Sequence, residues 1–217
     1  SYAPDRVEMI ALRGLPMVGP GMDLAEMIDA GLKAASLELR DDDILVVAQK
    51  IVSKAEGRIV RLADVTPSEE ARRRGRETGK DPALVQLILD ESVEVLRQGA
   101  QVLIVEHRLG LVMANAGIDQ SNAAPGCAIL LPLDPDASAA RLAAALGQRS
   151  GCRIGVIIID SFGRAWRKAT VGHAIGVAGL RALLDLRQSP DLLGRPMQVT
   201  EVGLADAPES GVEYLTR

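Results

Sequence analysis

Three short aliphatic runs limit how this chain can fold. They occupy residues 44–48, 102–105 and 155–159, and none is longer than five residues. A helix that spans a bilayer needs about 20 apolar residues, so these runs are far too short to cross a membrane. Their length and their aliphatic side chains instead indicate buried β-strands. Because amphipathic helices are interleaved with them, the pattern predicts an α/β protein.

The composition narrows the class of protein further. The 217 residues include 25 Lys and Arg against 29 Asp and Glu, a net charge of −4, and only four residues are aromatic. A nucleic-acid-binding protein needs a basic surface and aromatic stacking positions, and this composition provides neither. The chain opens without a secretory pattern, and Cys127 and Cys152 stand singly, as expected for buried thiols in a reducing compartment. We therefore expect a soluble cytoplasmic protein that binds neither nucleic acid nor membrane.

Periodicity and capping signals predict the remaining elements. We expect helices over residues 23–39, 67–79, 82–96 and 134–149. We expect strands over residues 44–48, 127–131, 154–160 and 170–180, and a β-hairpin formed by residues 102–106 and 111–114.

Residues 170–180 carry glycine or alanine at every second position. One face of this strand therefore lacks bulky side chains, which suits the close approach of another backbone or of a ligand. We expect residues 1–217 to form one region, with two intertwined subdomains as the alternative.

Acidic residues lie where two of the predicted strands end. Asp160 and Ser161 directly follow the run at 155–159, and a carboxylate beside a hydroxyl is typical of Mg²⁺ ligation. In residues 114–122, Asp119 and Asn122 offer a carboxylate and an amide from one turn. A loop-capping aspartate and an Asx-turn are the plainer alternatives. Two aspartates at two strand ends, with basic residues nearby, nevertheless favour a metal–phosphate site.

A basic segment follows the strand at 44–48. Lys50 and Lys54 are four residues apart with Ser53 between them, so two ammonium groups and a hydroxyl are available for phosphate oxygens. On physical grounds alone, a solvated basic turn explains these residues slightly better. His107 and His173 are too few for an imidazole metal cluster, and His173 is more typical of a packed strand residue than of a general base.

Five segments together resemble one family, the coenzyme F420-0:L-glutamate ligases. They are GLPMV at 14–18, SKAEGR at 53–58, ANAGIDQSN at 114–122, DSFGR at 160–164 and GHAIGVAG at 172–179. Each segment is a weak signal alone, but their conjunction in the family's order, over residues 7–205, is specific. The resemblance implies an α+β fold with mixed, largely antiparallel sheets and flanking helices.

The resemblance also implies the site. Guanine-nucleotide contacts are implied for Leu15, Pro16, Met17, Val18, Gln49, Lys54 and Asn122. Metal ligation is implied for Asp119, Asp160 and Ser161. The implied cation is Mg²⁺ or Mn²⁺, with K⁺ as a further candidate, and the implied assembly is a homodimer. Relatives commonly carry a small hydroxyl residue at the position of Gln49.

The implied reaction joins L-glutamate to coenzyme F420-0, driven by GTP through an acyl phosphate, and repeats on the glutamate side chain. Metal on the carboxylates and the charge of Lys54 would stabilise the phosphoryl transfer, while no residue stands out as the general base. The alternative is a non-catalytic nucleotide- or phosphometabolite-binding module, which needs no acceptor pocket. A scaffold protein would leave the paired aspartates unexplained.

The end of the chain departs from the family pattern. Relatives follow a strand like residues 199–203 with a helix, a glycine-rich turn and a final strand that closes over the nucleotide. Here Ala207 leads straight into Pro208, so we expect a segment to be missing near residues 207–208. We also expect no C-terminal flavin-reductase-like domain of the kind that some bacterial relatives carry.

Overall fold

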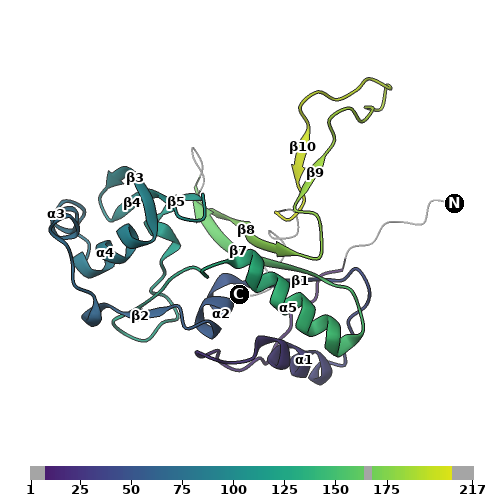
Figure 1. The fold of residues 1–217 in the computed structure, drawn as a ribbon, viewed down its shortest axis with the longest axis horizontal. Helices are drawn as coiled ribbons and strands as arrows, with labels where there is room; N and C mark the ends of the chain where they lie inside the picture. Colours follow the sequence, from purple (N-terminus) through teal and green to yellow (C-terminus); the bar gives the residue numbers. More distant parts are fainter. Residues whose placement is uncertain (1–7, 164–167, 207–217) are drawn as a thin grey trace.

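A three-stranded sheet forms the centre of the computed structural model, which describes residues 8–163 and 168–206. The sheet has the order β1 (Ile44–Ala48), β7 (Gly155–Gly163), β8 (Thr170–Ala178). Strand β1 pairs with β7 in parallel, and β7 pairs with β8 antiparallel (Figure 1). Strand β8 carries one extra residue between the pairs Ile158–Gly176 and Ile159–Ala174, which is a β-bulge.

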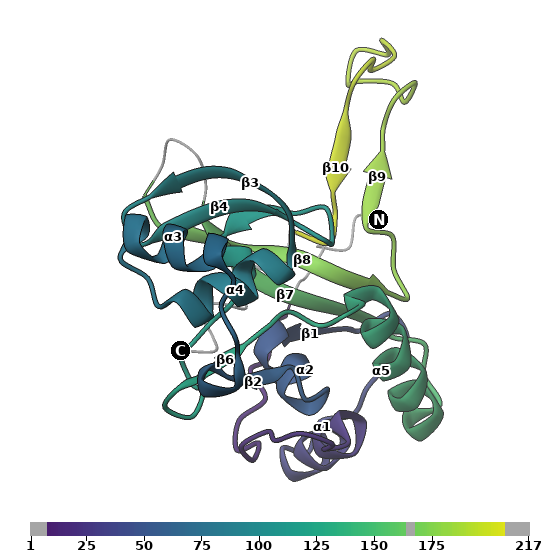
Figure 2. The same ribbon diagram turned by 60° about the vertical axis from the view of Figure 1, so that its left-hand side comes forward.

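Three helices pack against this sheet: α1 (Leu24–Ala34), α2 (Gln49–Ala55) and α5 (Pro135–Ser150). Figure 2 shows them gathered on one side of it. The first hydrophobic core lies between these layers, where Val156 and Ile158 of β7 are joined by Ile28 of α1 and Leu146 of α5. Burial of such aliphatic side chains is the main force that holds the layers together.

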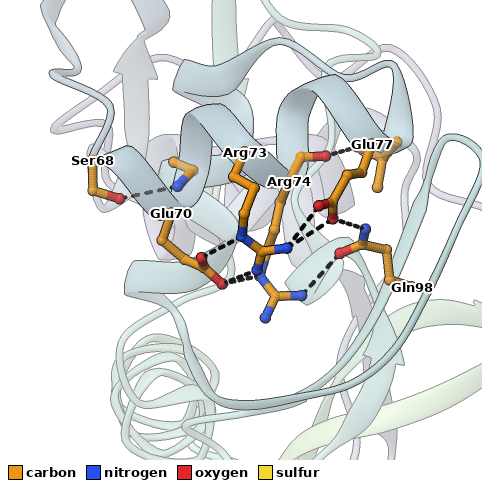
Figure 3. A network of polar contacts seen from close by, with 8 residues as sticks. Ser68, Glu70, Arg73, Arg74, Glu77 and Gln98 are labelled. Atoms are coloured by element: carbon orange, nitrogen blue, oxygen red, sulfur yellow. Dashed lines mark hydrogen bonds and ion pairs between the residues drawn. The ribbon is translucent and has the colours of Figure 1, made fainter.

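A second layer pair contains an antiparallel sheet of β3 (Ser92–Gly99), β4 (Val102–His107) and β5 (Val112–Ala114). Helices α3 (Glu69–Thr78) and α4 (Pro82–Asp90) belong to the same unit, whose core includes Val85, Ile88, Leu103 and Val105. In Figure 3, Arg74 of α3 donates to Gln98 of β3, and Gln98 in turn donates to Glu77 of α3. These contacts, one part-buried and one exposed, link α3 to the sheet and add little free energy of folding.

Two ribbons complete the described fold. Strand β2 (Ile59–Arg61) pairs with β6 (Cys127–Ile129). The short 3-10 helix η1 (Leu62–Asp64) follows β2, and η2 (Asn115–Gly117) follows β5. Strand β9 (Leu183–Asp185) pairs with β10 (Glu201–Gly203) in an arm that projects from the body (Figures 1 and 2). None of the described helices is long and apolar enough to cross a lipid bilayer.

The α+β class with mixed, largely antiparallel sheets is confirmed. The starts of α1, α4 and α5 were also predicted correctly, because side chains of Asp23, Asp81 and Asp134 accept hydrogen bonds from the first turns of these helices. Cys127 and Cys152 are free thiols as expected, although both are only half-buried. The expected break near residues 207–208 lies outside the described residues.

Two predicted helices are too long. Helix α1 ends at Ala34 rather than residue 39, because Ser36 adopts a positive φ of 54° that stops the helix. Val95 and Leu96 belong to strand β3 and not to the preceding helix, which ends at Asp90. Val95 pairs with Val105 of β4, so strand pairing outweighs the helical spacing that the sequence suggested.

The glycine-rich face of β8 is explained by helix packing. A Cβ atom built on Gly176 would lie 2.5 Å from the backbone of Pro135, at the start of α5. The strand also holds this helix through its backbone, because Val177 N donates to Asp136 Oδ1 at 2.8 Å. Close backbone approach was one of the two uses predicted for this face, and at Gly176 it is confirmed.

We expect Gly176→Ala to destabilise the protein by about 1–3 kcal/mol, because the added methyl group must push α5 away from the sheet. Urea unfolding measures this loss. The matched control is Gly19→Ala, which adds a methyl group where no other atom lies within 4 Å. Equal stability of the Gly176 variant and the wild type would contradict the close contact.

Candidate functional site

The carboxyl ends of β1 and β7 place the candidate site. The two strands are parallel and pair from Ile44–Gly155 to Ala48–Ile159, so they end side by side. Gln49 and Lys50 follow one strand while Asp160 follows the paired end of the other, and all three therefore lie at one edge of the sheet. The bulge in β8 lies next to Asp160, where a bulge can redirect a side chain.

Asp119 reaches this edge from the loop after η2. Its backbone pairs with Ile129, with Asp119 N donating to Ile129 O at 3.0 Å and Ile129 N donating to Asp119 O at 2.8 Å. Its carboxylate accepts from Ser121 N at 2.7 Å, which is the Asx-turn given as the plainer alternative. The same carboxylate forms an ion pair with Lys50, so the Asx-turn orients the aspartate toward the site.

Asp119 and Asp160 interact electrostatically. Burial raises the pKa of Asp160 to about 6, and the negative charge of Asp119 adds to this effect, while the Ser161 backbone N–H, Lys50 and Gln49 act against it. Burial also disfavours the ionised form of Asp119, but donors from Lys50 and Ser121 outweigh it and lower its pKa. The structure thus brings together Asp119 and Asp160, two of the three predicted metal ligands, and the third, Ser161, contributes its backbone N–H to Asp160.

Gln49 packs beneath the acidic pair. Its side chain is 1% exposed, and Ser53 Oγ donates to Gln49 Oε1 at 2.9 Å. This bond turns Gln49 Nε2 toward Asp160, whose pKa it lowers, without completing a hydrogen bond of normal geometry. The amide therefore acts as a buried dipole beside the Asp160 carboxylate.

The basic segment is a helix, and its interpretation as a solvated basic turn is wrong. Helix α2 spans Gln49–Ala55, and Val52 on it belongs to the first hydrophobic core. Lys54 is only 9% exposed and has no hydrogen-bond or ion-pair partner among the described residues. A lysine ammonium held in this way is available for an anionic ligand.

The segment at 14–18 is anchored by its apolar ends. Leu15 and Val18 pack against the first core, while Pro16 and Met17 are exposed. Within the described part of the chain, no hydrogen bond joins the segment to Asp119 or Asp160. Asn122 is exposed in the Asp119 loop, with a positive φ of 57°.

His173 is packed as a strand residue. Its ring stacks on Phe162 with 4.9 Å between ring centroids, and its Nδ1 lies 3.1 Å from Val171 O. It pairs with Asp160 across β7 and β8. These contacts fit the expectation of a packed strand residue and assign it no role in catalysis.

One charged cluster near the site gave no recognisable signal in the sequence. Glu91 accepts from Arg58 Nη2 at 2.7 Å and from Arg108 Nε at 3.0 Å. Burial raises its pKa, but His107 and the two arginines outweigh burial and bring it to about 2. Arg58 Nε also donates to Leu131 O at 2.9 Å, so the cluster ties the end of α2 to the segment after β6 that follows Ile129.

The donor set fits a hard divalent cation. Among the described residues, no group of three His, Cys, Asp or Glu side chains is placed to hold a metal on its own. Mg²⁺ usually takes only one or two carboxylates and completes its shell with water and substrate phosphates. Asp119 lies close enough to Asp160 for its charge to raise the pKa of Asp160, and two such carboxylates match that requirement.

We expect Asp160→Asn to stabilise the metal-free protein. The folded-state pKa of about 6 is above the usual 3.8, so ionisation of Asp160 opposes folding: its cost in stability is absent below pH ~4 and grows as the pH rises through 6. A neutral amide avoids that loss, and the gain at pH 8 should reach at most about 3 kcal/mol. Urea unfolding with a chelator, from pH 4.5 to 8, measures the difference. A gap between the two proteins that does not widen with pH would contradict the buried carboxylate.

Comparison with known proteins gives a consistent result. The sequence profile described as F420-0:Gamma-glutamyl ligase matches residues 14–210. The protein named coenzyme F420:L-glutamate ligase from Methanothermobacter thermautotrophicus is 45% identical over 92% of this chain and 79% of its own length. Proteins of the same name are 44% identical in Methanopyrus kandleri (97% of this chain, 81% of that protein) and 43% identical in Archaeoglobus fulgidus (93% and 78%).

Proposed function

Because this chain belongs to the F420-0:gamma-glutamyl ligase family and is a ligase of coenzyme F420 biosynthesis, we propose that it joins L-glutamate to coenzyme F420-0 with GTP as phosphoryl donor. Further glutamates are added in the same way, through γ-linkages. The observation that carries the proposal is the meeting of Asp119, Asp160 and Lys50 at the edge formed by β1 and β7.

The reaction needs two bond exchanges. The bond between the γ-phosphorus and the bridging oxygen of GTP breaks while a carboxylate oxygen of the acceptor bonds to phosphorus, giving GDP and an acyl phosphate. The glutamate amine then attacks the acyl carbon, the carbon–oxygen bond to phosphate breaks, and the amine loses a proton. Phosphoryl transfer depends mainly on positioning and on neutralising charge, so this site has to gather anionic oxygens and cations.

Asp119, Asp160 and Ser161 would hold Mg²⁺ or Mn²⁺, with K⁺ as a further candidate cation. Such a metal neutralises charge on the phosphates when it is bound. The chain supplies a cation of its own in Lys54, whose largely buried side chain has no hydrogen-bond or ion-pair partner among the described residues and whose ammonium group would contact phosphate oxygens. The nucleotide would be contacted by the segment 14–18, where Pro16 and Met17 are exposed and Leu15 and Val18 are anchored in the core. Gln49 and Asn122 would also contact it.

The enzyme should be assayed with GTP, Mg²⁺ or Mn²⁺, L-glutamate and coenzyme F420-0. We expect GDP, phosphate and a glutamylated product in equal amounts. Asp160→Asn should lower turnover by at least about 100-fold, because it removes a carboxylate that would hold the charge-neutralising metal. Asp64→Asn is the matched control, since Asp64 is an exposed residue paired with Arg61 away from the site.

Nucleotide binding without acceptor-dependent GDP release would instead support the non-catalytic binding module. Full activity of the Asp160 variant would remove Asp160 from the site.

The projecting arm supports a homodimer. No side chain between residues 183 and 204 is buried, and Leu192, Leu193 and Val199 are almost wholly exposed. A two-stranded ribbon is marginally stable in water by itself, and exposed apolar residues in a group mark an interaction surface. A second copy of the chain, docked through this arm, would cover the exposed apolar residues of both arms at once, because the interface would be symmetric.

We expect the wild type to be a dimer in light-scattering measurements, and the Leu192→Ser/Leu193→Ser double variant to dissociate at least about tenfold more readily, because it removes apolar contact area. Ile10→Ser, at an exposed residue outside the arm, is the control and should leave the dimer intact. A monomeric wild type would contradict the proposed assembly.

A further inference from the structure

We propose that Lys50 is a built-in substitute for the metal, which neutralises the acidic pair in the metal-free protein and must leave Asp119 when the metal binds. This role rests on the metal site of the proposed function. Lys50 is not among the implied metal ligands or nucleotide contacts. The proposal predicts that removing the positive charge of Lys50 makes the site bind its metal more tightly.

The contacts show that Lys50 occupies the ligand atom itself. Its Nζ forms an ion pair with Asp119 Oδ2 and donates to Ser121 Oγ at 2.9 Å. Ser121 Oγ in turn donates to Asp119 Oδ2 at 2.8 Å, and Ser121 N donates to Oδ1. Donors therefore occupy both oxygens of the Asp119 carboxylate. A cation that binds Oδ2 has to displace the ammonium group.

The charges at this edge explain why a substitute is needed. Asp119 and Asp160 repel each other, and Lys50 is the cation whose field stabilises the ionised form of both. Without metal and without Lys50, the two partly buried carboxylates would be stabilised only by neutral dipoles from Gln49, Ser121 and the Ser161 backbone N–H. The ammonium group therefore keeps the acidic pair assembled before the metal arrives.

The position of Lys50 allows the exchange. It lies in the first turn of α2, and its side chain is 32% exposed, so the four-carbon stem can swing toward water while the helix stays in place. The Lys50 and Asp119 side chains keep 32% and 28% of their surface exposed, so solvent screens the pair in part and a divalent cation can displace the ammonium group. Lys54, one turn later, is buried and has no carboxylate partner among the described residues.

Binding of Mn²⁺ to the nucleotide-free protein at pH 8, measured from the electron paramagnetic resonance signal of free Mn²⁺, tests the exchange. We expect Lys50→Met to bind Mn²⁺ at least about threefold more tightly than the wild type, because the competing cation is gone. Lys54→Met controls for the loss of one positive charge near the site and should change the affinity less. Lys50→Arg keeps a competing cation and should bind Mn²⁺ like the wild type.

Thermal unfolding gives a second measurement that does not depend on activity. With a chelator present, Lys50→Met should unfold at a lower temperature than the wild type, because the acidic pair has lost its counter-ion. Saturating Mn²⁺ should close that gap, since the metal then supplies the missing charge. A gap that stays open in Mn²⁺ would mean that Lys50 has only a structural role and would overturn the inference.

The binding outcomes separate this inference from the proposed function. Asp119→Asn and Asp160→Asn should both weaken Mn²⁺ binding. If they do so while Lys50→Met binds no more tightly than Lys54→Met, the exchange is wrong and the metal site stands. If both aspartate variants bind Mn²⁺ like the wild type, the proposed metal site is wrong and the role of Lys50 falls with it.

Discussion

The parallel pairing of β1 with β7 is the constraint on which the rest of the structure depends. It aligns two buried aliphatic strands in one register, from Ile44–Gly155 to Ala48–Ile159, so that the chain leaves both strands at the same edge. Helix α2 can begin only where β1 ends, and Asp160 can reach the same place only because β7 continues past its partner to pair with β8. The apolar packing and pairing of these two strands therefore determine where the polar residues of the site lie.

Charge at the site conflicts with folding. Burial and the neighbouring Asp119 make the ionised form of Asp160 unfavourable, yet a metal ligand has to be ionised. The fold offsets part of this conflict with groups that are themselves held in place. Ser53 orients Gln49, Ser121 orients Asp119, and the Glu91 cluster ties the end of α2 to the segment behind Asp119. Active sites commonly retain such unfavourable charges because the ligand, rather than the fold, satisfies them.

Much of the framework could be predicted from the sequence, because strands 44–48 and 154–160 and the capped helix starts carry strong local signals. The rest depends on distant contacts. Helix α2 has only seven residues, and its apolar side chains face a core that exists only after the sheet has formed. The apolar spacing around Val95 fits either a helix or a strand, and only pairing with β4 makes it a strand. The candidate residues of the site stand out in the sequence as polar positions after the strands and as family motifs, and their roles stay predictions. The pair of Lys50 with Asp119 joins positions far apart in the chain, so no local pattern could reveal it.

The bulge in β8 gives the site a dependence on chain length. One extra residue lies between the pairs Ile158–Gly176 and Ile159–Ala174, one pair before Asp160 and its partner His173. Successive residues of a strand point to opposite faces. Which residues of β8 flank Asp160 therefore depends on the number of residues in the strand as well as on their type. In this hairpin, a substitution alters one contact, whereas the loss of a single residue would shift every pair beyond it.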